Sequence, residues 1–273
     1  MPEPIRRTVP GPAGELVVWD HAGGAPATLL LHGIGNYGRV WDLVADSVAG
    51  RLRLIAPDAR GHGDSAAPPT GYDAADFVAD ATAIIDALTV DRVLVVGHSM
   101  GGGHGFAFAQ AHPERCSGLV LIDIGPELEA AGRERSVRLT RERPASFADD
   151  DAAEAYLRKT SPGYSDAAYA NRMQWLFRLG PVGLTWRADA AALAQIMGTP
   201  RPGTWAALSE LRLPVLVVRG TRSLYLSAAA AQRMVETIPD ARLLELDAGH
   251  NVQLDQPAAL AAAIVAFARE AAP

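Results

Sequence analysis

The chain has little cysteine and no long apolar run. Cys116 is the only cysteine among 273 residues, so no intramolecular disulfide can form and a disulfide-stabilised secreted domain is excluded. No apolar run approaches the roughly 20 residues that span a bilayer. The segment 1–9 also lacks the apolar stretch of a secretory signal peptide. We therefore expect a cytoplasmic protein with no membrane partner.

The chain also has no excess of positive charge. Its net charge of −6 is spread along the sequence, which argues against nucleic acid as the main partner. Arg138, Arg141 and Arg143 form a local basic cluster that Glu134 and Glu142 interrupt, and we interpret it as a solvated helix face. A hydrophobic content of 49% indicates a soluble protein with a sizeable core. The expected partner is a small-molecule substrate, and the sequence does not define the oligomeric state.

Short apolar runs alternate with amphipathic segments, which is the order that builds a parallel sheet covered by helices. The predicted strands are Leu16–Trp19, Thr28–Leu31, Leu52–Ala56, Val93–Val96, Gly118–Ile122, Val215–Val218 and Arg242–Leu246. The predicted helices between the early strands are Val40–Val48, Ala74–Leu88 and Gly102–Ala111. The fold class is therefore α/β, with a mostly parallel central sheet.

The alternation stops between Pro126 and Leu213, where no convincing strand is visible. A structureless loop of this length is implausible in a compact domain, so we predict an inserted helical lid over residues 127–212. Residues 1–126 and 213–273 then form the two parts of the core. Trp175 and Trp186 are candidate substrate-binding residues of this lid.

The stretch Gly97-His98-Ser99-Met100-Gly101 directly follows the strand Val93–Val96. The pattern G-x-S-x-G at the end of a buried strand is typical of a nucleophile elbow, where a sharp turn exposes the serine hydroxyl and glycines leave room on either side. Ser99 is therefore the candidate nucleophile for acyl transfer.

Acyl transfer also requires an oxyanion hole and a base. Met100 follows the nucleophile, and Ile34 lies in a glycine-flanked turn after Leu31, so their N–H groups are the candidate oxyanion donors. His250 follows the last strand and is the candidate base. His32 and His62 are better interpreted as structural histidines in turns.

Several motifs together resemble the α/β-hydrolase superfamily over essentially the whole chain. They are His32-Gly33, Asp58-x-Arg60-Gly61-x-Gly63-x-Ser65, Gly97 to Gly102, Pro214 to Gly220 and Gly249-His250. The resemblance implies an α/β-hydrolase fold, a catalytic triad and a lid domain.

One departure from the superfamily pattern concerns the triad acid, which usually follows the strand equivalent to Val215–Val218. Here the stretch 220–227 contains no carboxylate. Asp123 directly follows Gly118–Ile122, and the carboxyl ends of parallel strands converge on one crevice. The chain thus resembles the subgroup of lidded serine esterases and lactonases whose acid follows the sixth strand. Asp123 is the candidate acid, with Asp247 and Asp255 as fallbacks.

The expected function is that of a serine hydrolase, a carboxylic ester hydrolase in type, with Ser99, His250 and Asp123 as the triad. Its substrate is a carboxylic ester, lactone, thioester or activated amide. No cofactor and no metal are expected, because no His, Cys and carboxylate cluster has ligand spacing. Two alternatives stay open: a cofactor-independent dioxygenase of heteroaromatic rings and an inactive ligand-binding relative. An acyltransferase would share the same chemistry.

Overall fold

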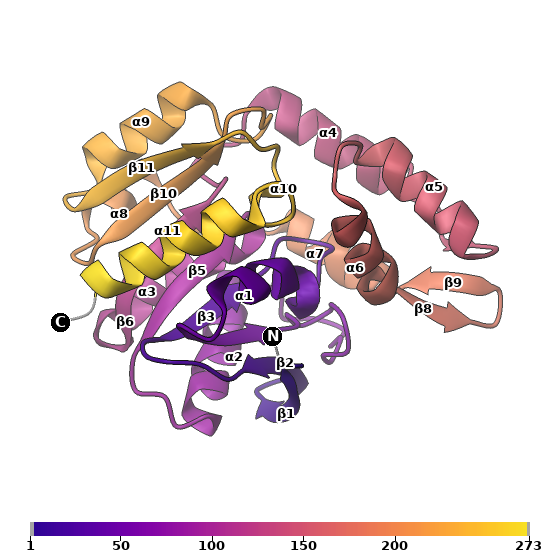
Figure 1. Cartoon of the computed structure of the whole chain (residues 1–273), viewed down its shortest axis with the longest axis horizontal. Coiled ribbons are helices and arrows are strands. Elements are labelled where there is room, and N and C mark those ends of the chain that lie inside the picture. The colour runs from indigo at the N-terminus through magenta and orange to yellow at the C-terminus, as the bar shows by residue number, and fades with distance from the viewer. Residues whose placement is uncertain (1–2, 272–273) are drawn as a thin grey trace.

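The computed structural model describes residues 3–271 and is built on one central sheet of eight strands (Figure 1). These strands are β1 (Ile5–Gly11), β2 (Gly14–His21), β3 (Ala27–Leu31), β4 (Arg53–Pro57), β5 (Val93–His98), β6 (Cys116–Ile122), β10 (Val215–Gly220) and β11 (Ala241–Leu246). Their order in space is β1-β2-β4-β3-β5-β6-β10-β11. The pairs β1·β2 and β2·β4 are antiparallel and the remaining pairs are parallel. The predicted α/β class is confirmed.

Every strand predicted from the sequence is present, with ends shifted by a few residues at most. The sequence pattern did not predict β1, because this strand is almost entirely exposed and shows no apolar alternation. It is an edge strand held in a hairpin by β2. With Val9 as its only buried residue, β1 has no alternation that local pattern could identify.

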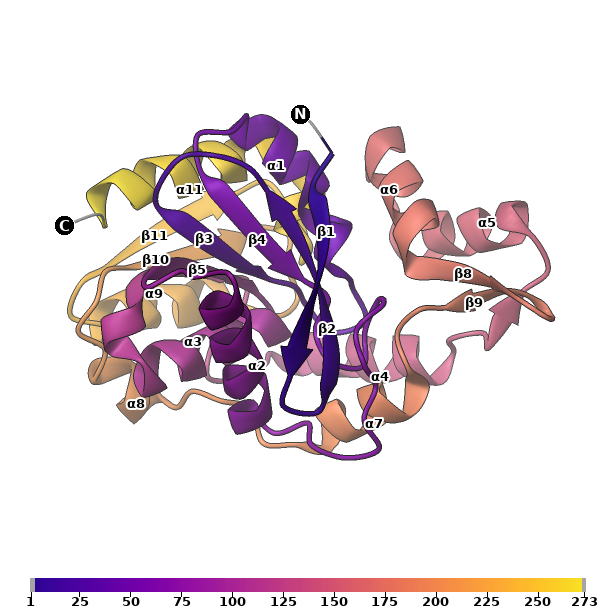
Figure 2. The same cartoon turned by 90° about the horizontal axis from the view of Figure 1, so that it is seen from below.

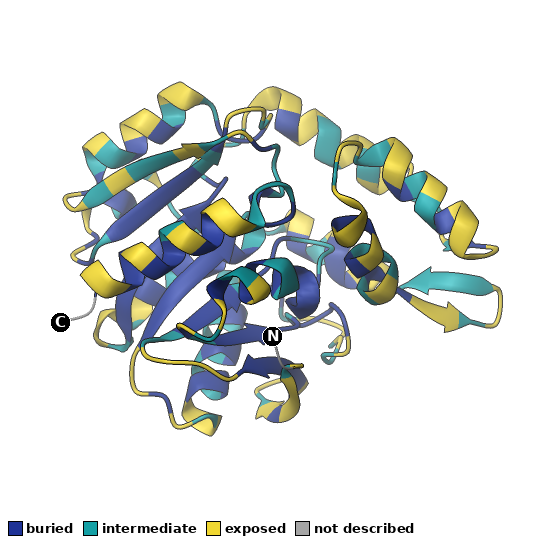
Figure 3. Ribbon diagram, in the orientation of Figure 1, coloured by how far each residue is buried: buried dark blue, intermediate teal, exposed yellow. Residues whose placement is uncertain are grey.

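Helices cover both faces of the sheet (Figure 1). The helices of one face are α1 (Asp42–Val48) and α11 (Pro257–Glu270), and those of the other are α2 (Ala74–Ala87), α3 (Met100–Ala111), α8 (Trp205–Ser209) and α9 (Ala228–Thr237). Shorter helices are η1 (Gly38–Trp41), η2 (Pro113–Arg115) and α10 (Val252–Asp255). Because strand side chains alternate, β5 sends Leu94 and Val96 into one core and Val93 and Val95 into the other. Figure 3 shows that the buried residues gather in the sheet and on the inward faces of these helices.

Two helix boundaries carry residues that commonly mark helix ends, an aspartate at an N-cap and a proline after a C-terminus. Asp73 is the N-cap of α2, and its own N–H is accepted by the Asp76 carboxylate at 3.0 Å. Pro113 follows the end of α3 and starts η2 instead. Over residues 3–271 no helix is long and apolar enough to cross a membrane.

The segment between β6 and β10 is not purely helical, so that part of the prediction is wrong. Before α8, which covers the central sheet, its elements are α4 (Ala130–Arg141), β7 (Ser146–Phe147), α5 (Asp150–Thr160), α6 (Asp166–Leu176), β8 (Phe177–Gly180), β9 (Gly183–Trp186) and α7 (Ala190–Gly198). The three strands form a separate antiparallel sheet in the order β7-β9-β8. They are at most four residues long, too short to show a period of two. Figure 2 shows α5, α6 and the β8–β9 hairpin standing clear of the central sheet.

Five histidines are buried and held neutral: His98, whose pKa burial lowers well below its ordinary value, and four others. Burial lowers the pKa of His21 and His32 to about 4 and that of His62 and His104 to about 3. A histidine in the unfolded chain has a pKa of about 6.5. Between about pH 6.5 and 4 the unfolded chain therefore binds protons that the folded protein does not, and stability is lost as the pH falls.

We expect acid lability in that window. Burial also raises the pKa of Asp42 and Asp58 to about 6, and these two carboxyls act in the opposite direction, but they offset only part of the loss. Because the His104 ring stacks on Phe77 with centroids 3.8 Å apart, His104→Phe keeps the packing and removes one titration. The drop in the free energy of unfolding from pH 7 to pH 5, measured by urea denaturation, should shrink by about 2 kcal/mol. An equal drop in both proteins would contradict this account.

Candidate active site

Ser99 lies in the sharp turn that joins β5 to α3. Its backbone has φ 50° and ψ −116°, a conformation that non-glycine residues adopt only under strain. The turn is also tight, because a Cβ on Gly97 would lie 2.3 Å from the carbonyl oxygen of Gly101. A Cβ on Gly101 would lie equally close to that of Leu31. The glycines are therefore required by close backbone approach, as expected for a nucleophile elbow.

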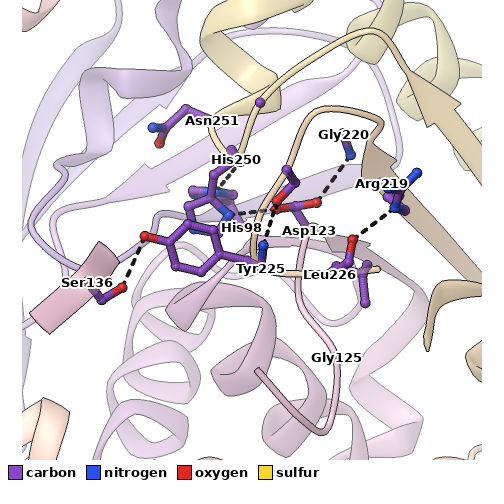
Figure 4. A network of polar contacts seen from close by, with 12 residues as sticks. His98, Asp123, Gly125, Ser136, Arg219, Gly220, Tyr225, Leu226, His250 and Asn251 are labelled. Carbon is purple, nitrogen blue, oxygen red and sulfur yellow. Dashed lines mark hydrogen bonds and ion pairs between the residues drawn. The ribbon is translucent and has the colours of Figure 1, made fainter. Parts of the chain in front are cut away.

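The side chains of His250 and Asp123 point toward one another (Figure 4), and the His250 carbonyl contacts His98, the residue before Ser99. His250 Nδ1 lies 2.7 Å from Asp123 Oδ2. Asp123 directly follows β6, has φ 50° and is 1% exposed. Its other oxygen, Oδ1, accepts the Gly220 N–H at 3.2 Å. The hydrogen bond fixes the proton of neutral His250 on Nδ1 and leaves Nε2 as an acceptor.

The fallback acids are engaged elsewhere. Asp247 is exposed and pairs with Arg222. Asp255 Oδ2 accepts the Gly249 N–H at 2.6 Å, so it supports the backbone just before His250 and does not bond its ring.

Two residues of the loop after β10 complete the surroundings of His250, and sequence reasoning missed both. The Ser223 hydroxyl donates to Asp123 Oδ2, the same oxygen that His250 contacts. Ser223 Oγ in turn accepts the Tyr225 N–H at 3.0 Å. The Tyr225 ring stacks on the His250 imidazole, with centroids 3.8 Å apart and planes 20° apart. Ser223 is the third residue after Gly220, in the stretch where the superfamily usually places its acid. This position in the sequence could have identified Ser223 as a residue of the site.

His98, next to Ser99, connects the loops of the site. Its Nε2–H donates to the His250 carbonyl at 2.8 Å, and burial lowers its pKa well below the ordinary value. A Cβ on Gly33 would lie 2.7 Å from His98 Nδ1, so the glycine lets the first loop pack against this ring. A neutral His98 thus holds the loops of Gly33 and His250 together.

The candidate oxyanion donors come from two elements. Met100 is the first residue of α3, where backbone N–H groups have no intrahelical acceptor. Ile34 lies in the turn closed by Asn36 N–H to Gly33 O at 3.1 Å, in which Gly35 has φ 72°. The Gly35 N–H is taken by His62 Nε2 at 2.9 Å, which fixes the turn.

His32 and His62 are structural, as the sequence predicted. His32 bridges Gly33 O at 2.8 Å and the Ala59 N–H at 3.0 Å. His62 bonds Arg60 O at 3.1 Å through its second nitrogen.

A cavity of about 1210 Å³ opens above Ser99. The core contributes Ile34, Ser99, Met100 and His250 to its lining, and the inserted segment contributes Arg143, Tyr156 and Trp186. The inserted segment therefore lies on the same side of the sheet as Ser99. Among residues 3–271 no group of three or more His, Cys, Asp or Glu side chains is arranged to hold a metal ion.

Two sequence interpretations change here. Trp175 is absent from the cavity lining; it packs edge-on against Trp19 at 5.1 Å with Arg39 over its ring. Arg143 does not lie on a solvated helix face, because it follows the end of α4 and turns into the cavity. The packing of Trp175 and the cavity position of Arg143 cannot be predicted from the spacing of neighbouring residues in the sequence.

The chain belongs to the alpha/beta hydrolase fold family, whose model matches residues 26–257. It is 32% identical to the 2-(acetamidomethylene)succinate hydrolase of Mesorhizobium japonicum over 80% of this chain and 78% of that protein. It is 31% identical to a putative 2-succinyl-6-hydroxy-2,4-cyclohexadiene-1-carboxylate synthase of Bacillus subtilis, over 85% and 86%. The crystal structure of an E-2-(acetamidomethylene)succinate hydrolase superposes with a TM-score of 0.87 at 32% identity, covering 96% of this chain and 98% of that one. Fold and relatives support hydrolase activity.

The Ser223 contact generates a prediction. Ser223→Ala removes a donor from Asp123, so the carboxylate charge facing His250 is less compensated. Ester hydrolysis should fall by about tenfold, and the acidic limb of the pH profile should move to higher pH because the imidazolium is favoured. Thr221→Ala, in the exposed part of the same loop, is the matched control. If the acidic limb of the pH profile of Ser223→Ala lies where it does in the wild type, Ser223 only packs against Asp123 and does not modulate its charge.

Proposed function

We propose that the protein is a serine hydrolase that cleaves a carboxylic ester, lactone, thioester or activated amide. The observation that carries the proposal is the hydrogen bond of His250 to the buried Asp123 beside a strained Ser99. A carboxylate behind an imidazole, next to a serine at the mouth of a cavity, is the arrangement that activates a hydroxyl as nucleophile.

In the proposed reaction, Ser99 Oγ attacks the acyl carbon while His250 Nε2 takes its proton. Asp123 stabilises the resulting imidazolium, and the Ile34 and Met100 N–H groups bind the oxyanion. His250 then returns the proton to the leaving group as the acyl-enzyme forms. A water molecule attacks the acyl-enzyme with the same base, which releases the acid and restores Ser99.

The relatives agree with this reaction type. One named relative is a hydrolase, and a structural neighbour at 26% identity and TM-score 0.82 is the thioesterase domain from the curacin biosynthetic pathway. A cofactor-independent dioxygenase would use His250 and Asp123 without Ser99 as the attacking group, and its signature is oxygen consumption. An inactive binding protein would show neither reaction.

The nucleophile and the base are tested together. Ser99→Ala and His250→Ala should each lower kcat/KM for p-nitrophenyl esters by about a thousandfold or more, because the two residues act as one unit. Wild-type protein should be labelled by a fluorophosphonate, and Ser99→Ala should not. Full ester hydrolysis in Ser99→Ala, or oxygen uptake without labelling, would exclude the serine hydrolase.

The position of Asp123 after β6, next to Ser223 after β10, allows a rescue experiment. Asp123→Asn should lower kcat several hundredfold or more, since the amide cannot stabilise the imidazolium. Because the Ser223 hydroxyl already touches the Asp123 carboxylate, the double variant Asp123→Asn, Ser223→Asp returns a carboxylate to the neighbourhood of His250 Nδ1. We expect it to recover at least about tenfold of the lost rate. The matched control is Asp123→Asn, Ser223→Asn, which adds the same volume without charge and should recover nothing.

If Asp123→Asn retains nearly the wild-type kcat, Asp123 is not the acid of the triad. Thermal unfolding of each variant shows whether the fold is intact.

A further inference from the structure

The cavity above Ser99 is lined by more positive than negative side chains. Its arginines are Arg133, Arg135, Arg143, Arg172, Arg201 and Arg222, and its carboxylates are Glu127 and Asp255. Both carboxylates have donors already: Glu127 accepts Trp205 Nε1–H at 2.8 Å and Asp255 accepts the Gly249 N–H at 2.6 Å. The lining therefore has unused cations.

Four of these arginines are engaged by the protein or open to solvent. Arg222 pairs with Asp247. Arg135 donates to Thr160 O at 2.8 Å and Arg201 to Gly125 O at 3.3 Å. Arg133 is exposed, where water solvates its charge.

Arg143 and Arg172 differ from these four. Both are half-buried, and within residues 3–271 neither forms an ion pair with a carboxylate. The Arg143 guanidinium lies 4.0 Å from the centroid of the Trp186 ring. The Arg172 guanidinium lies 5.4 Å from that of Tyr164, and its Nε is buried with no hydrogen-bond partner. Burying a cation without a partner is costly, so a partner from outside the chain is indicated.

Arg143, Arg172 and Tyr156 all line the cavity. The Trp186 ring under Arg143 lies 6.0 Å from the Tyr156 ring, centroid to centroid, and the Tyr164 ring that Arg172 contacts lines the same cavity. Burial raises the pKa of the Tyr156 phenol, and the charges of Arg143 and Arg172 both oppose that rise. Burial also lowers the pKa of Arg143 to about 10, so Arg143 remains a cation at neutral pH. Two half-buried cations that line one cavity are suited to bind an anion there.

The same cavity has an apolar wall. Val137, Met197 and Leu224 are 54%, 42% and 49% exposed, and all three line the cavity. Exposed large apolar side chains that gather in a cavity indicate a binding surface for hydrocarbon. The volume of about 1210 Å³ exceeds the upper end of about 1,000 Å³ that is usual for small-molecule pockets.

We propose that Arg143 and Arg172 bind a carboxylate of the acyl substrate, whose hydrocarbon part lies against Val137, Met197 and Leu224. This inference rests on the proposed serine hydrolase. The substrate class is then an acyl compound with a free carboxylate separated from the scissile carbonyl by a hydrocarbon segment. Planar guanidinium groups suit a carboxylate because each can donate two parallel hydrogen bonds.

The test compares two p-nitrophenyl esters of octanedioic acid, one with the second carboxyl free and one with it methylated. For the wild type, kcat/KM should favour the free acid by about tenfold or more, the value of one charged hydrogen bond. Arg143→Gln and Arg172→Gln should each bring the ratio of the two kcat/KM values toward one. Arg141→Gln is the matched control, because Arg141 is exposed on α4 and does not line the cavity; its ratio should equal that of the wild type.

A wild-type ratio near one, or a ratio unchanged in both arginine variants, would overturn the carboxylate site while the serine hydrolase stands. Loss of the proposed function is recognised separately, by no hydrolysis of either ester and no fluorophosphonate labelling. A binding measurement then decides the site without catalysis: calorimetric titration of Ser99→Ala with monomethyl octanedioate and with dimethyl octanedioate. Tighter binding of the monoacid, lost on Arg143→Gln in that background, supports the site, and equal binding of the two excludes it.

Discussion

The hydrogen bond between His250 and Asp123 joins two loops that are 127 residues apart in the chain, and the rest of the site depends on it. Asp123 is anchored at the end of β6 by its N–H to Val218 O at 2.8 Å and by the Gly220 N–H on its side chain. The imidazole is therefore positioned from the central sheet. His98, Ser223 and Tyr225 each restrain one component of this bond, so its geometry is fixed before any substrate binds.

The acid can lie after β6 because β6 and β10 are parallel neighbours in register. Their carboxyl ends converge at the same edge of the sheet, and Asp123 and Ser223 touch there. A carboxylate that follows either strand can therefore reach His250. The residue that follows the other strand must then be a hydrogen-bond donor and not a second negative charge. Two carboxylates at this distance would repel each other and raise one pKa. The serine at position 223 is thus a physical counterpart of the aspartate at position 123.

The sequence predicted those parts of the fold that local pattern encodes. Buried strands such as β5 and β6 are continuous apolar runs, and the elbow has a strict glycine spacing, so both were found. The hydrogen bond of Asp123 to His250 was predicted from strand order. The strands of the inserted segment, the place of Trp175 and the cavity contact of Arg143 were not, because each depends on contacts between residues distant in the chain. Ser223 and Tyr225 were not predicted, because a hydroxyl donor and a stacked ring have no sequence signature comparable to that of a triad carboxylate.

The site divides between two parts of the chain with different physical demands. Ser99 and Asp123 directly follow the inner strands β5 and β6, where backbone hydrogen bonds on both sides limit movement, and His250 is held by Asp123. Arg143, Tyr156 and Trp186 come from the inserted segment, which is joined to the core by contacts such as Asn251 Nδ2–H to Tyr164 OH at 2.8 Å. Chemistry requires positions fixed to a fraction of an ångström, whereas substrate selection tolerates variation in helices that pack against the core. Under the proposed function, changes in the insertion can therefore alter which acyl group is accepted while the hydrogen bond between His250 and Asp123 stays intact.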